Sequence, residues 1–216
     1  MPGITKKPRR PTARQIDNAF APYALEIGRL TRAWNGLHNM LGEIFSRIIS
    51  RNNVNISRAI WHSLMSDKTQ RDILKAAYQA PGAIDSKVHP KAIADLKWLI
   101  KNVDDLGFRR NDAIHAPMLV GKYMRTGEMV VLPDIYAGNP RAIKLHEKEL
   151  LLELRWYRMC ADTLAKFAGV IWFHLGRDKG SWPERPLLPT LGQGQTDRAS
   201  RRKKGNAKSS DPENSI

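Results

Sequence analysis

The sequence predicts an all-α protein, an antiparallel helical bundle with a small two-stranded excursion near residues 118–135 and disordered basic termini. Apolar residues recur at steps of three, four and seven over residues 20–48 and again over 150–175. This spacing places them on one face of an α-helix, so two long amphipathic helices are expected as neighbours in the core. Two short apolar runs flank Arg125-Thr126-Gly127, a sequence typical of a hairpin turn.

Composition divides the 216 residues into one domain and two basic ends. Residues 1–15 contain five Lys or Arg, several prolines and no acid, which predicts a disordered arm. Residues 16–176 form the predicted helical domain. Residues 177–216 begin with a Pro-rich stretch and hold nine basic against five acidic residues, which predicts a linker and a disordered tail. No secretory signal and no membrane-spanning run is expected.

Shorter helices are expected between the two long ones. Asn55 can cap one of them. Asp67 with Gln70 three residues later resembles a capping box, and the helix it begins would end before Ala80-Pro81-Gly82. Pro90 suits the first turn of a further helix that leads into the most polar stretch of the chain.

The formal charge of +15 favours a polyanionic partner, of which RNA is a common one, or else serves only solubility. A single cysteine, Cys160, excludes an internal disulfide and a cysteine-based zinc site, and it fits a reducing, cytoplasmic compartment. The histidines lack partners at metal-ligand spacing. We therefore assign neither a metal nor another cofactor.

The stretch from Phe108 to Pro117 holds two Arg, an Asn, an Asp and a His within seven consecutive positions, a density of reactive and charged side chains that no other segment reaches. In a helix, Asn111 and His115 share a face, and the long side chain of Arg110 can reach it. Arg110 lies seven residues after Val103, on an apolar stripe, so it should either face a packed partner with its charge compensated or line a pocket. Gly107 could kink this helix and change that phase.

Arg110-Asn111 followed by three residues and His115 resembles the Arg-polar-x-x-x-His signature of the HEPN superfamily, and the flanking sequence reads like bacterial HEPN proteins. The resemblance implies an all-helical domain and a metal-independent ribonuclease of a bacterial defence or toxin system. It also implies a homodimer whose two motifs face each other, and an antitoxin or defence protein as a further partner. The family includes members that have lost catalysis.

In such an enzyme the RNA 2′-hydroxyl attacks the adjacent phosphorus. His115 is the candidate general base or acid, because an ordinary imidazole titrates near neutral pH. Arg110 is the candidate phosphate clamp and Asn111 the candidate orienting amide. Arg109 is a secondary candidate for RNA contact, although an ion pair with Asp112 is the simpler expectation. One basic run could also contact RNA or could serve only to keep the tail soluble: Arg201, Arg202, Lys203 and Lys204.

Other interpretations stay open. His38 and Glu43 could approach the motif, but a surface or capping role is the simpler expectation for both. The leading functional hypothesis is a metal-independent endoribonuclease. The second is a non-catalytic helical module that binds nucleic acid or a protein and keeps the motif as a polar network at a dimer interface. The third is a module that binds a nucleotide or another small ligand in a bundle pocket.

Overall fold

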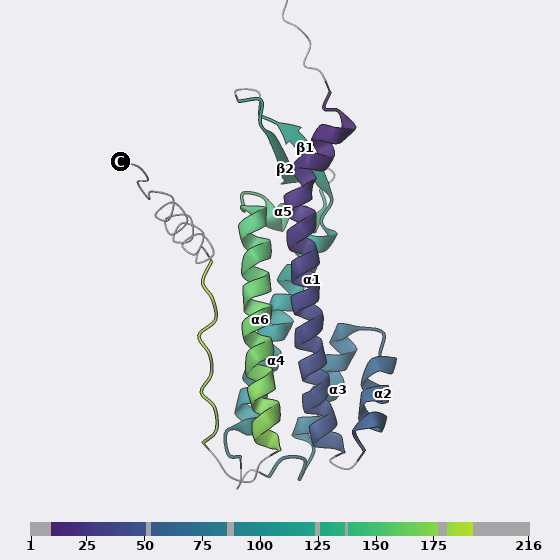
Figure 1. The fold of residues 1–216 in the computed structure, drawn as a ribbon, viewed down its shortest axis with the longest axis vertical. Coiled ribbons are helices and arrows are strands. Elements are labelled where there is room, and N and C mark those ends of the chain that lie inside the picture. Colours follow the sequence, from purple (N-terminus) through teal and green to yellow (C-terminus); the bar gives the residue numbers. More distant parts are fainter. Residues whose placement is uncertain are drawn as a thin grey trace, which may run out of the picture.

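The computed structural model describes residues 10–50, 53–85, 89–123, 126–136, 138–176 and 181–191. Within these ranges it contains six helices and one two-stranded antiparallel sheet (Figure 1). The elements in chain order are α1 (Ala13–Ile49), α2 (Val54–Ser63), α3 (Asp67–Gln79), α4 (Ala92–His115), β1 (Met118–Lys122), β2 (Met129–Pro133), α5 (Pro140–Leu145) and α6 (Leu150–Leu175). The predicted all-α fold with a small two-stranded excursion is confirmed.

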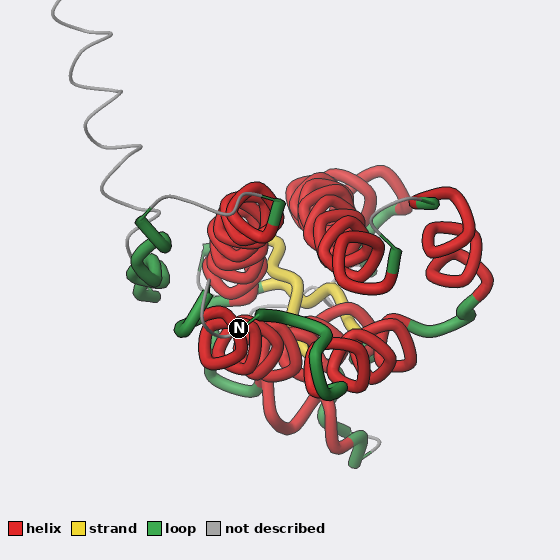
Figure 2. The backbone as a smooth tube through the Cα atoms, turned by 90° about the horizontal axis from the view of Figure 1, so that it is seen from below, coloured by secondary structure: helices red, strands yellow, loops and turns green. Residues whose placement is uncertain are grey.

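The long helices α1, α4 and α6 pack around a common core, and Figure 2 shows them end-on. α1 and α6 lie side by side, as expected, with Arg158 near Glu26 at one end and Arg47 over Trp172 at the other. These contacts show that α1 and α6 run parallel. α4 runs antiparallel to both, because Trp98 near its start packs on Phe167 near the end of α6, and Arg109 near its end lies over Trp156 near the start of α6. The predicted antiparallel packing therefore holds for α4 and not for the α1–α6 pair. The chain reverses direction between α1 and α4 and again between α4 and α6, so α1 and α6 point the same way.

Helix α1 begins earlier than its apolar pattern indicated. Thr12 and Gln15 form a capping box, in which the Thr12 hydroxyl accepts from the Gln15 backbone N–H and the Gln15 side chain accepts from the Thr12 N–H. The last three residues of the expected disordered arm are therefore helical. Residues 1–9 lie outside the described part of the chain.

Two helix caps differ from the predicted ones. Asn53, not Asn55, caps α2 by accepting from Ile56 N–H. Ser66, not Asp67, caps α3 by accepting from Thr69 N–H. The carboxylate of Asp67 is thereby left for a partner on another helix.

Gly107 does not interrupt α4, which continues to His115. A Cβ at this position would lie 3.1 Å from Cη2 of Trp34. Glycine thus permits α4 to approach the largest side chain of α1 closely, and that approach brings the polar end of α4 against α1.

The hairpin pairs β1 with β2 in antiparallel register, with Leu119 opposite Leu132. Gly127 has a φ of +74°, which glycine adopts without strain. Val131 is buried on the inner face. Arg125, part of the predicted turn, lies outside the described residues.

Residues 181–191, which lie in the predicted linker, pack on the bundle, whereas residues 177–180 and 192–216 of the predicted linker and tail lie outside the described residues. Asp95 of α4 is buried and accepts hydrogen bonds from Trp182 Nε1 at 2.6 Å and Arg185 Nε at 2.5 Å. Trp156 Nε1 donates to the carbonyl of Pro189 at 2.7 Å. A buried carboxylate requires such partners, which fixes this segment in place. The run from Arg201 to Lys204 lies outside the described residues.

None of the described helices is both long enough and apolar enough to cross a membrane.

Candidate functional site

The last two turns of α4 carry the Arg-Asn-x-x-x-His motif. Arg110 is half-buried, whereas Asn111 and His115 are exposed. Phe108 lies three residues before Asn111 and seven before His115, and 69% of its surface is exposed. Phe108, Asn111 and His115 therefore form an exposed strip along one helix face, with Arg110 at its inner edge.

Arg110 packs on an aromatic ring instead of forming an ion pair. Its guanidinium carbon lies 5.2 Å from the ring centroid of Trp34, within cation–π range. Its Nη1 donates to Oδ1 of Asn111 at 2.9 Å, and its buried Nε has no hydrogen-bond partner among the described residues. Burial lowers the pKa of Arg110, and the charge of Asp67 opposes that effect. Arg110 thus faces a packed partner, Trp34, but among the described residues no ion pair compensates its charge, in contrast to the expectation.

His115 occupies the last turn of α4, next to the point where the chain turns into β1. Within the described part of the chain, no hydrogen bond or ion pair engages its imidazole. The ring is therefore available to a molecule that approaches from solvent.

Arg109 and Asp112 do not form the expected ion pair. Arg109 lies over the ring of Trp156 on α6, 5.3 Å from its centroid. Asp112 pairs with Lys144 at 2.9 Å and lies 3.9 Å from Arg141, both on α5. The charges of the motif thus connect α4 to two neighbouring helices, a result of tertiary packing that spacing along one helix cannot reveal.

Trp34 is a neighbour of Arg110 that the sequence did not single out. Its ring is 2% exposed, and its Nε1 donates to Asp67 at 2.6 Å. This bond uses the carboxylate that does not cap α3, and it fixes the plane on which Arg110 rests. The negative charge of Asp67 also acts on Arg110, because it opposes the lowering of the pKa of Arg110 by burial.

Arg71 is a second arginine at Trp34, and its guanidinium bonds to an acidic and to a histidine side chain. Its Nε donates to Asp104 at 2.6 Å and its Nη1 to Nε2 of His38 at 3.3 Å. Lys75 also bonds to Asp104, at 2.8 Å. Although burial raises the pKa of Asp104, the hydrogen bonds from Lys75 and Arg71 leave that pKa below its usual value.

His38 is buried at the centre of this cluster, which corrects the expectation of a surface or capping role. Its Nδ1 lies 3.1 Å from the side-chain oxygen Oε1 of Gln70, and its Nε2 accepts from Arg71. Both contacts require the neutral ring with the proton on Nδ1. Burial is the main cause that lowers the pKa of His38, and the charges of Arg71 and Arg110 lower it further.

Glu43 does not approach the site, because its carboxylate pairs with Arg58 on α2 at 2.9 Å. Among the described residues, no three His, Cys, Asp or Glu side chains gather closely enough to hold a metal ion. No protein-family model, no curated protein and no solved structure matches the chain.

Proposed function

We propose that this protein is a metal-independent endoribonuclease of HEPN type that uses Arg110, Asn111 and His115. The observation that carries the proposal is Arg110, a half-buried cation that packs on Trp34 and, among the described residues, has no carboxylate bonded to it. An arginine fixed in this way keeps N–H groups for an incoming phosphate, which matches its planar fork.

The reaction would require two proton transfers. A base removes the proton of the 2′-hydroxyl, the 2′-oxygen bonds to phosphorus, and the P–O5′ bond breaks as an acid protonates the leaving oxygen. The products are a 2′,3′-cyclic phosphate and a 5′-hydroxyl. His115 supplies one of these transfers, Arg110 stabilises the charge on the phosphoryl oxygens, and Asn111 orients the sugar or phosphate.

A homodimer would supply the second histidine. The family resemblance implies two motifs that face each other, and the exposed strip of Phe108, Asn111 and His115 is suited to that contact. RNA is the proposed substrate, in agreement with the net charge of +15. A cytoplasmic defence or toxin system, with an antitoxin or defence protein as partner, is the proposed setting.

The test is cleavage of labelled total RNA and tRNA in EDTA by the wild type, His115→Ala and Arg110→Ala, after folding and oligomeric state are matched. Cleavage by the wild type alone, with 2′,3′-cyclic phosphate ends, supports the proposal. Absence of cleavage by all three proteins contradicts it for these substrates.

The packing of Arg110 on Trp34 also favours a second candidate, a non-catalytic module that binds nucleic acid or a protein and uses the motif as a polar network at a dimer interface. In that case Arg110→Ala lowers the melting temperature or dissociates the dimer, and there is no nuclease activity to lose.

A further inference from the structure

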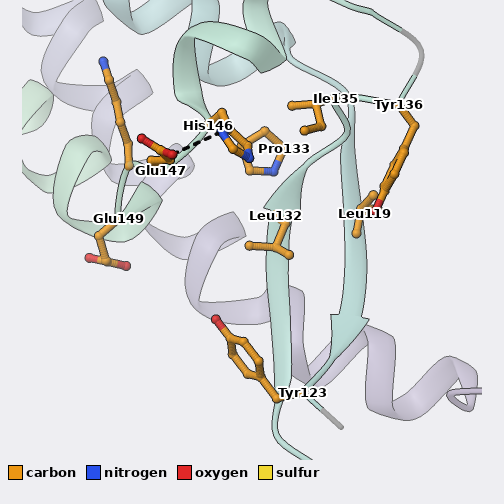
Figure 3. A pocket seen from close by; sticks show the side chains of 10 residues that line it. Leu119, Tyr123, Leu132, Pro133, Ile135, Tyr136, His146, Glu147 and Glu149 are labelled. Atoms are coloured by element: carbon orange, nitrogen blue, oxygen red, sulfur yellow. Dashed lines mark ion pairs between the residues drawn. The ribbon is translucent and has the colours of Figure 1, made fainter.

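A pocket of about 470 Å³ opens between the hairpin and the turn that joins α5 to α6. Figure 3 shows side chains from the hairpin on one side and from that turn on the other. The volume falls within the range typical of small-molecule sites. The pocket lies outside the Arg-Asn-x-x-x-His motif.

Apolar and aromatic groups form the hairpin side of the pocket. Leu119 and Leu132 are cross-strand partners on the outer face of the sheet, and Leu132 is 40% exposed. Tyr123 and Tyr136 follow β1 and β2, and they are 53% and 90% exposed. Exposed aromatic rings beside an aliphatic floor are suited to a flat ring that stacks.

Charged groups form the opposite side. The carboxylate of Glu149 is occupied, because it accepts from the first N–H groups of α6. Glu147 lies 3.9 Å from Nδ1 of His146, and Lys148 lies between the two carboxylates in sequence. The two negative charges disfavour a phosphate here, and the carboxylate of Glu147 can accept hydrogen bonds from the N–H groups of a neutral ring.

Both sides of the pocket are connected to the end of α4. The carbonyl of Pro117, two residues after His115, accepts from the backbone N–H of Asp134, and β2 ends directly before that residue. On the other side, Asp112 pairs with Lys144, which precedes the α5–α6 turn. The pocket is therefore positioned by the same elements that position the motif.

We propose that this pocket binds a nucleobase of single-stranded RNA, in a nucleotide near the phosphate that Arg110 would hold. The proposal rests on the proposed function and adds a binding site to it. Stacking on Tyr136 and Tyr123 accounts for affinity, as is usual for single-stranded RNA. The carboxylate of Glu147 accounts for a preference for bases with amino donors.

The test measures the affinity of a fluorescent 2′-O-methyl octanucleotide, which lacks the attacking hydroxyl and cannot be cleaved by this route. Tyr136→Ala should weaken binding by roughly 5- to 100-fold, the range for loss of one stacking platform, and Tyr136→Phe should retain it. Phe173→Ala is the matched control, since Phe173 is a partly exposed aromatic near the far end of α6. An abasic oligonucleotide of the same length should bind the wild type and Tyr136→Ala equally.

The outcomes distinguish failure of the proposed nucleobase pocket from failure of the proposed ribonuclease function. Loss of octanucleotide affinity in Tyr136→Ala alone supports the pocket even if the wild type cleaves no RNA, in which case only the proposed function fails. No binding by the wild type overturns the pocket, as does equal affinity in the wild type and Tyr136→Ala. An equal loss in Phe173→Ala also overturns it.

Discussion

Two arginines lie against the same tryptophan, with Arg71 at 6.0 Å and Arg110 at 5.2 Å from the ring centroid of Trp34. Arg71 is 7% exposed and bonded to both Asp104 and His38. Arg110 is half-buried, and within the described part of the chain its guanidinium bonds only to the neighbouring Asn111, while its buried Nε has no partner. The same residue type therefore stabilises the fold at one position and is left available at the other.

The difference lies in which helix supplies the counter-charge. α4 places the carboxylate of Asp104 beside Arg71, so that Arg71 has a counter-charge within the bundle, and Lys75 of α3 shares that carboxylate. At Arg110 the carboxylate that follows in sequence, Asp112, is drawn away to Lys144 on α5. This separation leaves positive charge at the end of α4, beside an exposed histidine.

The largest expected loss of stability follows from Arg71→Met. Removal of Arg71 leaves Asp104 with only Lys75 and leaves the Nε2 of His38 without its donor. We expect the free energy of unfolding to fall by about 2–4 kcal/mol, near the lower end for a broken buried pair because Asp104 is partly exposed. Urea denaturation measures it. Arg58→Met, which breaks the exposed pair with Glu43, is the control and should change little.

Much of the fold was predictable because it depends on local periodicity. The three-four spacing identified α1 and α6, and the turn at Gly127 identified the hairpin. The parallel direction of α1 and α6 was not predictable, since it depends on how the intervening elements reverse the chain. The motif itself was visible, but its support was not, because Trp34 and Asp67 approach Arg110 from other helices.

Two features of the sequence indicate polar side chains with buried partners. His38 lies four residues after Trp34 and three before Leu41, on the buried face of α1, which indicates a histidine with buried partners. Asp95 lies between Ala92 and Leu99 on the buried face of α4, which indicates a carboxylate that needs donors from elsewhere. Neither signal identifies the partner, because Arg71 and Trp182 are distant in sequence.

A second buried charge tests whether partnered groups are structural. Trp182→Phe keeps most of the ring but removes the N–H that bonds to Asp95. The free energy of unfolding should fall by about 1–2 kcal/mol, as expected for loss of a hydrogen bond to a buried charge. Trp172→Phe serves as the control, since that ring faces Arg47 and not a carboxylate. Equal stability of Trp182→Phe and the wild type would show that residues 181–191 contribute little.

The pKa of His38 predicts how stability changes with pH. Its folded pKa lies below 6.5, so on acidification the unfolded chain takes up the proton first, and stability falls as the pH drops below 6.5 toward the folded pKa. The ring then carries a proton that faces Arg71, with Arg110 nearby and Asp67 as the opposing charge. His38→Gln should flatten the decline in melting temperature between pH 7 and 5.5. The pKa values of Asp72 and Asp104, which lie below the ordinary carboxyl value, reduce stability only at lower pH, where these carboxylates become protonated. Parallel curves for the two proteins would contradict this role.

The smallest expected effect concerns Arg109. Arg109→Met removes an exposed cation–π contact with Trp156 and should cost about 0.5 kcal/mol of stability. If Arg109 also contacts a phosphate, the slope of log affinity against log salt for RNA falls by about one. Lys166→Met, an exposed cation elsewhere on α6, is the comparison. A slope that is equal in both variants would limit Arg109 to packing.

The contrast between a structural Arg71 and an available Arg110 is tested most directly by two measurements on the same samples of Arg71→Met and Arg110→Met. These are the free energy of unfolding and the rate of RNA cleavage. Arg110→Met should stay within about 1 kcal/mol of the wild type, because it loses one cation–π contact and relieves one buried unpaired N–H. Its cleavage in EDTA should fall by roughly 10²–10³-fold, the cost of losing a group that stabilises transition-state charge. Arg71→Met should lose stability and keep the activity of its folded fraction. An Arg110→Met protein that is as destabilised as Arg71→Met, yet cleaves RNA normally per folded molecule, would contradict the distinction.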